Sequence, residues 1–227
     1  MPACSFQVAP PDPPAPTPVT PADTSSNTLD VTAVIFEDQD ATDHMTDITF
    51  SFSTIVIEEQ NYVLFDDPNE EVVCNGLHQP LGKAQKYTLH VPHGHCTCTY
   101  SGNVEDKNGN GRPLPFVQMF DVAPRSALSP QPPIVTSNGF SVRYTPDSDD
   151  LCTIVGKAMD SAHDPPVSGQ PEPANEGVYS GPSTSSLHGT GDLFLIRTCT
   201  WHHLPGAFAN MDVTYISQAS VEVTWSH

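Results

Sequence analysis

The densest group of side chains that could bind a metal ion contains three histidines and two cysteines: His90, His93, His95, Cys96 and Cys98. Imidazole and thiolate are both good ligands for zinc and copper, so His93 and His95 together with Cys96 could hold either ion. A cysteine in a disulfide offers no thiolate, however. The competing interpretation, which we favour, is a surface turn over Pro92–His95 that leads into a strand.

A second candidate is an Asn- and Gly-rich stretch with the spacing of a calcium-binding loop. Its oxygen-bearing side chains stand at alternate positions, Asp106, Asn108 and Asn110, with glycines among them. The position of the bidentate glutamate holds Val117 instead, so the strongest ligand is missing. We favour an Asn-Gly hairpin turn, because both residues tolerate positive φ, and keep calcium as the alternative.

Two further groups bear on catalysis. His202 and His203 follow Trp201 and could bind a carbohydrate or respond to pH near about 6, but we favour a polar loop after a strand. Ser183–Ser186 lie in a Gly-, Pro- and Ser-rich segment without the Gly-x-Ser-x-Gly elbow of an activated serine. We predict that the chain is not an enzyme.

The cysteines indicate an internal duplication, which we favour over two unrelated β-domains that share Thr-rich strands by composition. The segment Thr97–Tyr100 reads Thr-Cys-Thr-aromatic, as does Thr198–Trp201, and each follows an earlier cysteine that stands after an acidic turn. Six cysteines indicate an oxidising compartment, although they allow 15 pairings. The repeat predicts one disulfide in each copy: Cys74–Cys98 and Cys152–Cys199. Cys4 and Cys96 are left over and could pair with each other, which would tie the N-terminal arm to the first domain.

Alternating apolar and polar residues predict strands that bury one face. Clear examples are Ile48–Phe52, Tyr87–Val91, Phe140–Tyr144 and Val221–Trp225, and no segment shows a helical stripe. We predict an all-β fold with two tandem β-sandwich domains. The expected boundaries are a Pro-rich arm at 1–28, the first domain at 29–122, a stiff Pro-rich linker at 123–133, and the second domain at 134–227 with a loop insertion at 160–190.

The charge of the chain excludes one class of partner. Eight Lys and Arg residues stand against 27 Asp and Glu residues, for a formal net charge of −19 at pH 7. Phosphate binding needs clustered cations, so we expect neither nucleic acid nor anionic lipid headgroups as partners. We also expect no membrane-spanning segment.

Two segments resemble known families. Lys86–Val91 followed by Gly102–Leu114 is similar to the closing half of bacterial Ig-like domains of surface-layer and adhesin type, although the extra Gly111 and Arg112 and the disulfide depart from the pattern. The resemblance implies an Ig-like sandwich with a binding, spacing or structural role. Met1–Ser5 resembles the end of a bacterial lipoprotein signal, which implies a lipid anchor at Cys4 and a Pro-rich spacer behind it.

These observations predict a non-enzymatic, extracytoplasmic surface protein with a structural or protein-interaction role. Its partner would be another protein or further copies of itself. One alternative is a structural subunit of an extracellular fibre or virus particle whose N-terminal arm bridges subunits. Another is a metal- or carbohydrate-binding accessory module. We expect no cofactor, unless calcium binds at Asp106–Asn110 or copper at His93 and His95.

Overall fold

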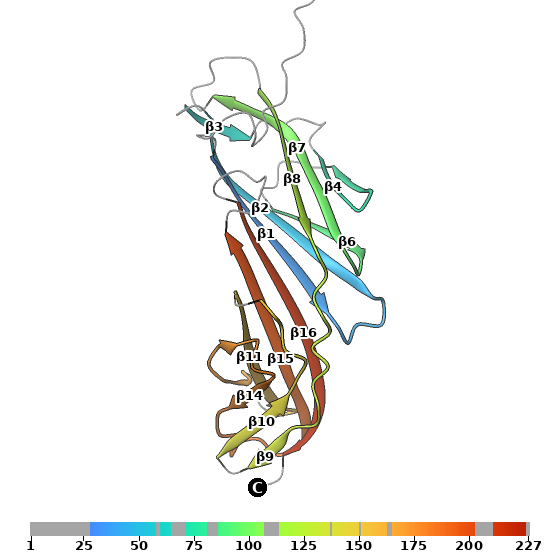
Figure 1. Cartoon of the computed structure of the whole chain (residues 1–227), viewed down its shortest axis with the longest axis vertical. Coiled ribbons are helices and arrows are strands. Elements are labelled where there is room, and N and C mark those ends of the chain that lie inside the picture. The colour runs from blue at the N-terminus through green and yellow to red at the C-terminus, as the bar shows by residue number, and fades with distance from the viewer. Residues whose placement is uncertain are drawn as a thin grey trace, which may run out of the picture.

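The computed structural model describes residues 28–57, 60–64, 71–80, 86–106, 114–136, 138–149, 151–162, 165–202 and 211–225. Every regular element in these ranges is a β-strand, which confirms the all-β, β-sandwich class (Figure 1). In the same ranges no helix is long and apolar enough to cross a membrane. All but the last residue of the predicted Pro-rich arm lies outside the described part of the chain.

The described strands follow one another with short connections. In chain order they are β1 (Thr28–Asp38), β2 (Met45–Ile57), β3 (Gln60–Leu64), β4 (Glu71–Cys74), β5 (Leu77–Pro80), β6 (Lys86–Pro92), β7 (Cys96–Asp106), β8 (Leu114–Val122), β9 (Ile134–Thr136), β10 (Gly139–Arg143), β11 (Cys152–Asp160), β12 (Val167–Ser168), β13 (Glu172–Pro173), β14 (Val178–Gly181), β15 (Gly189–His202) and β16 (Met211–Trp225).

Strands β1–β8 build an N-terminal sandwich. In one layer β2 pairs with β1 along one edge and with β6 along the other. In the second layer β7 lies between β8 and β4, and β5 extends the layer beyond β4. Strand β3 pairs with both β2 and β7 and so links the layers. The core includes Ile35, Ile48, Val72 and Val91, all fully buried as the alternation requires.

Strands β9–β16 build a C-terminal sandwich. One layer contains β11, β15 and β16, with β12 and β13 on the outer edge of β11, and the other contains β9, β10 and β14. The layers touch where Gly156 of β11 meets Tyr179 of β14. A Cβ atom at Gly156 would lie 2.4 Å from the Tyr179 ring, so only glycine fits there. Residues 160–190, expected to be a loop insertion, contain three short strands, and β14 pairs with β10.

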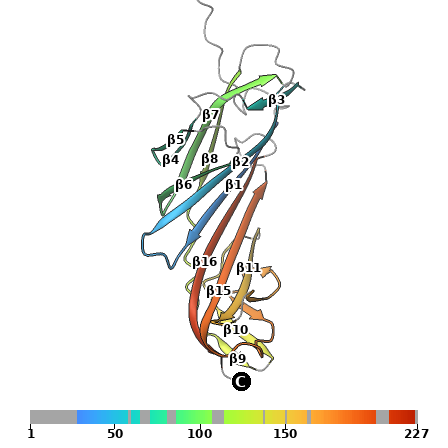
Figure 2. The same ribbon diagram turned by 180° about the vertical axis from the view of Figure 1, so that it is seen from behind.

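One parallel ladder joins the two sandwiches. Strand β1 pairs with β16 from Val31, opposite Met211, to Asp38, opposite Gln218. One hydrogen-bonded series of strands therefore continues from β12 in the C-terminal sandwich to β5 in the N-terminal sandwich. Figure 2 shows β2, β1, β16 and β15 side by side along the middle of an elongated molecule. The domain boundaries drawn from the sequence stay a prediction, but the two halves share this ladder.

Residues 123–133, predicted to be a linker, lie against both halves. The Leu128 side chain is fully buried. Its backbone N–H donates to Gln39 Oε1 at 2.8 Å, just after β1, and its carbonyl accepts from the Thr145 N–H at 2.7 Å. This segment is therefore fixed by packing and hydrogen bonds in addition to the stiffness of its prolines.

Candidate functional site

The most concentrated polar chemistry among the described residues lies where the 123–133 segment crosses β15. We call it the junction network and define it as Arg125, Asp147, Asp149, Arg197 and Trp201. Asp147 forms ion pairs with both guanidinium groups, with its Oδ1 3.1 Å from Arg125 Nη1 and its Oδ2 3.1 Å from Arg197 Nη1. Asp147 is only 5% exposed and Arg197 is 0% exposed. A buried charge is tolerated when it is paired and hydrogen-bonded, and both conditions hold here.

Arg197 occupies an inward position of β15, in line with Leu195 and Cys199. Its remaining donors are also satisfied, because Nη2 donates to the Ser126 carbonyl at 2.7 Å and Nε donates to Ser217 Oγ at 3.1 Å. Burial lowers the pKa of Arg197, and the Asp147 carboxylate opposes that shift. The side chain is a permanent buried cation that joins β15 and β16 to the 123–133 segment.

Arg125, on the 123–133 segment, contacts the remaining two members of the junction network, Asp149 and Trp201. Its Nη2 donates to Asp149 Oδ2 at 2.8 Å, and its guanidinium carbon lies 4.5 Å from the centroid of the Trp201 ring. Trp201 Nε1 donates to the same Asp149 oxygen at 3.2 Å. The backbone N–H of Leu151, and after it the Arg125 guanidinium, hold the pKa of Asp149 below its ordinary value.

The acidic turn before Cys152 is therefore not simply solvated, as such turns usually are. Asp147 is buried and Asp149 is half-buried, and both bind cations from distant parts of the chain. Sequence reasoning missed this role. The available signal was an arginine at an inward-facing position of a strand, which requires a carboxylate nearby.

A second polar group lies at the β1–β16 ladder. The Tyr215 hydroxyl donates a short hydrogen bond to Glu37 Oε2, and both residues are buried. Burial, followed by the neighbouring Glu37, raises the pKa of the Tyr215 hydroxyl. His93 Nε2 lies 3.6 Å from Glu37 Oε1, and His93 Nδ1 lies 3.4 Å from Thr46 Oγ1. This group ties the ends of β1 and β6 to β16.

A cavity of about 170 Å³ opens beside these residues. It is lined by Glu37, Asp38, Gln39, His44, Met45, His93, Arg125 and Ala127. Its walls come from the end of β1, the following turn, the β6–β7 turn and the 123–133 segment. Glu37, Asp38 and Arg125 in this lining already have partners within the protein. Glu37 binds Tyr215, Asp38 accepts from the Asp40 N–H, and Arg125 binds Asp147 and Asp149.

The structure does not gather the predicted metal-binding histidines into one site. His93 faces Glu37, whereas His95 Nε2 lies 3.1 Å from Asp121 Oδ1. His90 Nδ1 lies 2.6 Å from Asp47 Oδ1. Within the described ranges, His93, His95 and Cys96 belong to no group of three close ligand atoms. Each ring instead lies beside a carboxylate on another strand.

The calcium loop predicted from the sequence lies mostly outside the described part of the chain. Asn108 and Asn110 lie outside the described residues, and Asp106 is described only through its backbone at the end of β7. Calcium binding at this loop stays a prediction, as does the hairpin turn that competes with it. His203 also lies outside the described ranges, while His202 Nδ1 lies 2.7 Å from Asp212 Oδ1.

The structure joins Cys74 to Cys98 and Cys152 to Cys199, the two pairs expected from the repeat. In each case the cysteines stand directly opposite each other on adjacent antiparallel strands, so each bridge lies within a layer. Cys96 is a buried free thiol, whose pKa burial raises to about 11. Cys4, the other leftover cysteine, lies outside the described residues, and its fate stays a prediction.

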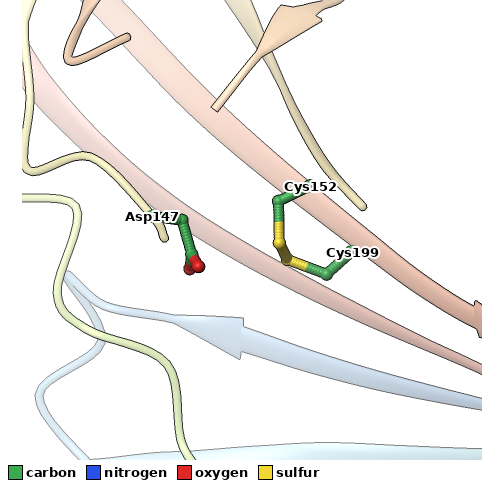
Figure 3. A group of neighbouring side chains, drawn as sticks. All are labelled: Asp147, Cys152 and Cys199. Carbon is green, nitrogen blue, oxygen red and sulfur yellow. A yellow bond between two sulfur atoms is a disulfide. The ribbon is translucent and has the colours of Figure 1, made fainter. Parts of the chain in front are cut away.

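One three-residue group has the spacing of a metal site. Ligand atoms of Asp147, Cys152 and Cys199 lie within 4.8 Å of one another (Figure 3). The two sulfur atoms are bonded to each other and offer no thiolate. Because both Asp147 oxygens also contact arginines, the group is part of the junction network and not a metal centre.

No protein-family model matches the chain, and a search of curated proteins finds no significant match. Among solved structures, a two-domain fibronectin type III segment of chicken tenascin covers 88% of this chain and 100% of its own, with 10% identity and a TM-score of 0.31. A tetra-tandem repeat from the extending region of a large adhesion protein covers 86% of this chain and 50% of its own, with 16% identity and a TM-score of 0.25. Both TM-scores are too low to support an inference about family or function.

Proposed function

We propose that this chain is a non-enzymatic, extracytoplasmic module with a structural or protein-interaction role, held at a cell surface by its N-terminal arm. The observation that carries the proposal is the β1–β16 ladder, which makes one elongated unit of two sandwiches. Domains joined only by a flexible linker move relative to each other, whereas a shared sheet fixes their orientation. A fixed, elongated unit suits display or spacing of a binding surface.

The contacts within the junction network support a structural role for its charged side chains. Catalysis needs acids, bases or donors that are free to meet a substrate. Arg197 and Asp147 instead form an ion pair with each other, while Arg197 donates to Ser126 and Ser217 and Asp147 accepts from Arg125. Groups committed in this way hold the 123–133 segment against β15 and are not available for chemistry on a ligand.

The cysteines and the charge support the proposed location. Two disulfides form and persist most readily outside the reducing cytosol. The net charge of −19 favours solubility and repels nucleic acids and anionic lipid headgroups, so the charge of this chain opposes adsorption to a membrane surface. In this proposal the anchor is a lipid on Cys4, and the Pro-rich segment after it is the spacer.

Thiol trapping on intact, acid-quenched cells tests the location. We expect Cys74, Cys98, Cys152 and Cys199 to resist alkylation under denaturing conditions until a reductant is added, whereas Cys96 reacts without one. Mass spectrometry of the native N-terminal peptide should show a diacylglyceryl group on Cys4. Free thiols at the four paired cysteines would refute the extracytoplasmic location. An intact Met1 with a Cys4–Cys96 bridge would refute the lipid anchor and favour the particle or fibre subunit.

A further inference from the structure

The first and last described strands of the chain are neighbours, and they run in the same direction. Eight register pairs connect β1 to β16, from Val31 opposite Met211 to Asp38 opposite Gln218. β16 then continues for a further seven residues to Trp225, near the end of the molecule marked C in Figure 1. The N-terminal segment therefore joins the ladder at the start of β1, and the C-terminal end of the chain follows the end of β16, at the opposite end of the ladder.

This geometry determines how tension acts on the molecule. A force between the chain's two ends pulls β1 by its start and β16 by its end, in opposite directions along a common axis. The ladder is therefore sheared, so its hydrogen bonds carry load together. A force applied to both strands at the same end would instead open the register pairs one after another. Forced unfolding follows the rate of crossing this barrier and not the equilibrium stability alone.

Neither strand can slide out by breaking only one ladder. On its other edge β1 pairs with β2 at nine positions, and β16 pairs with β15 at fourteen. Side chains add contacts across the β1–β16 ladder itself. Ala33 and Val213 stand opposite each other and are fully buried, and the Tyr215 hydroxyl is bonded to Glu37. Withdrawal of either strand would expose this apolar surface and leave the Glu37 carboxylate without its donor.

We propose that the β1–β16 ladder is a mechanical clamp that lets the module transmit tension between its N-terminal attachment and a partner bound toward its C-terminal end. The direction of the load rests on the proposed function, in which the N-terminal arm is the anchor. The resistance of the ladder to shear does not rest on it, because that follows from strand direction and register. The two ideas can therefore fail separately.

Single-molecule force spectroscopy in two pulling geometries tests the clamp on the full, oxidised chain. The first geometry attaches the handles at the N- and C-termini. The second geometry keeps the N-terminal handle and attaches the other handle to an azide-bearing residue that replaces the exposed His202. His202 is the last residue of β15 and stands opposite Asp212, at the start of β16. We expect a rupture force several-fold higher end to end, where the ladder is sheared, than in the second geometry, where it peels. Equal or lower end-to-end rupture forces would overturn the clamp.

A pair of matched substitutions separates the clamp from general stability. Tyr215→Phe removes the hydroxyl bonded to Glu37 across the ladder, whereas Tyr179→Phe removes a buried tyrosine's bond to the Gln170 carbonyl, away from it. We expect Tyr215→Phe to lower the end-to-end rupture force and Tyr179→Phe to leave it within error of the parent chain. Equal losses in the two variants would overturn the assignment of the Glu37–Tyr215 contact to the clamp. If the end-to-end rupture force is no higher than in the second geometry while the native protein still carries a lipid on Cys4, the clamp is refuted and the proposed function stands.

Discussion

Replacement of Asp147 by asparagine should destabilise the protein far more than the same change at an exposed ion pair. Asparagine keeps the shape and can still accept the Asp149 N–H bond, which is 3.0 Å long in the parent. What it removes is the negative charge 3.1 Å from Arg197, whose side chain is 0% exposed. The other Arg197 partners described above, on Ser126 and Ser217, are neutral, so a buried cation would be left without a counter-charge.

Removal of one partner from a buried ion pair costs about 3–5 kcal/mol. Arg125 keeps Asp149 as a partner in this variant, so we expect a loss near the lower limit, about 3 kcal/mol, in the free energy of unfolding. The matched control is Asp212→Asn at the exposed pair with His202, where we expect about 0–1 kcal/mol.

Urea denaturation followed by tryptophan fluorescence measures both losses, and an unchanged m-value would show that the comparison is sound. A loss for Asp147→Asn no larger than that for Asp212→Asn would refute the assignment of a structural charge pair. Adding Arg197→Met to Asp147→Asn should recover most of the loss, because no buried charge is then left unpaired.

Three further outcomes are expected. Double replacement of Cys152 and Cys199 by alanine should lower the free energy of unfolding by about 4 kcal/mol, since the bridge closes a separation of 47 residues, and calorimetry of the variant measures this. Native Cys96 should react with iodoacetamide far more slowly at pH 8 than after denaturation, because it is buried with a pKa raised to about 11; equal rates would contradict its placement. NMR titration should find the pKa of His90 above its ordinary value because its ring is hydrogen-bonded to Asp47, and Asp47→Asn should lower that pKa. The raised pKa stabilises the folded state at pH values below the unfolded pKa of His90. This stabilisation is lost as the pH rises through the folded pKa.

Local pattern was enough to predict the strands and the within-repeat cysteine pairs. Alternation places Leu193, Leu195, Arg197 and Cys199 on one face of β15, and the structure buries all four. The same alternation placed Arg197 at a buried position, but its ion-pair partner Asp147 was not predicted. The histidines of the alternative metal site lie apart in the structure, because nearness along the chain says little about where each ring points. His93 and His95 turn to different carboxylates, one on β1 and one on β8.

By itself the sequence determined what depends on neighbours along the chain: the β class, the inward and outward positions of each strand, and the two Thr-Cys-Thr repeats. Only the tertiary structure decided which distant groups meet. The β1–β16 ladder joins residues near 31 to residues near 211, and strand register over such a distance is set by mutual burial of apolar faces, not by any local signal. Asp147 became a buried ion-pair partner for the same reason, because Arg125 and Arg197 reach it only after the 123–133 segment packs across β15.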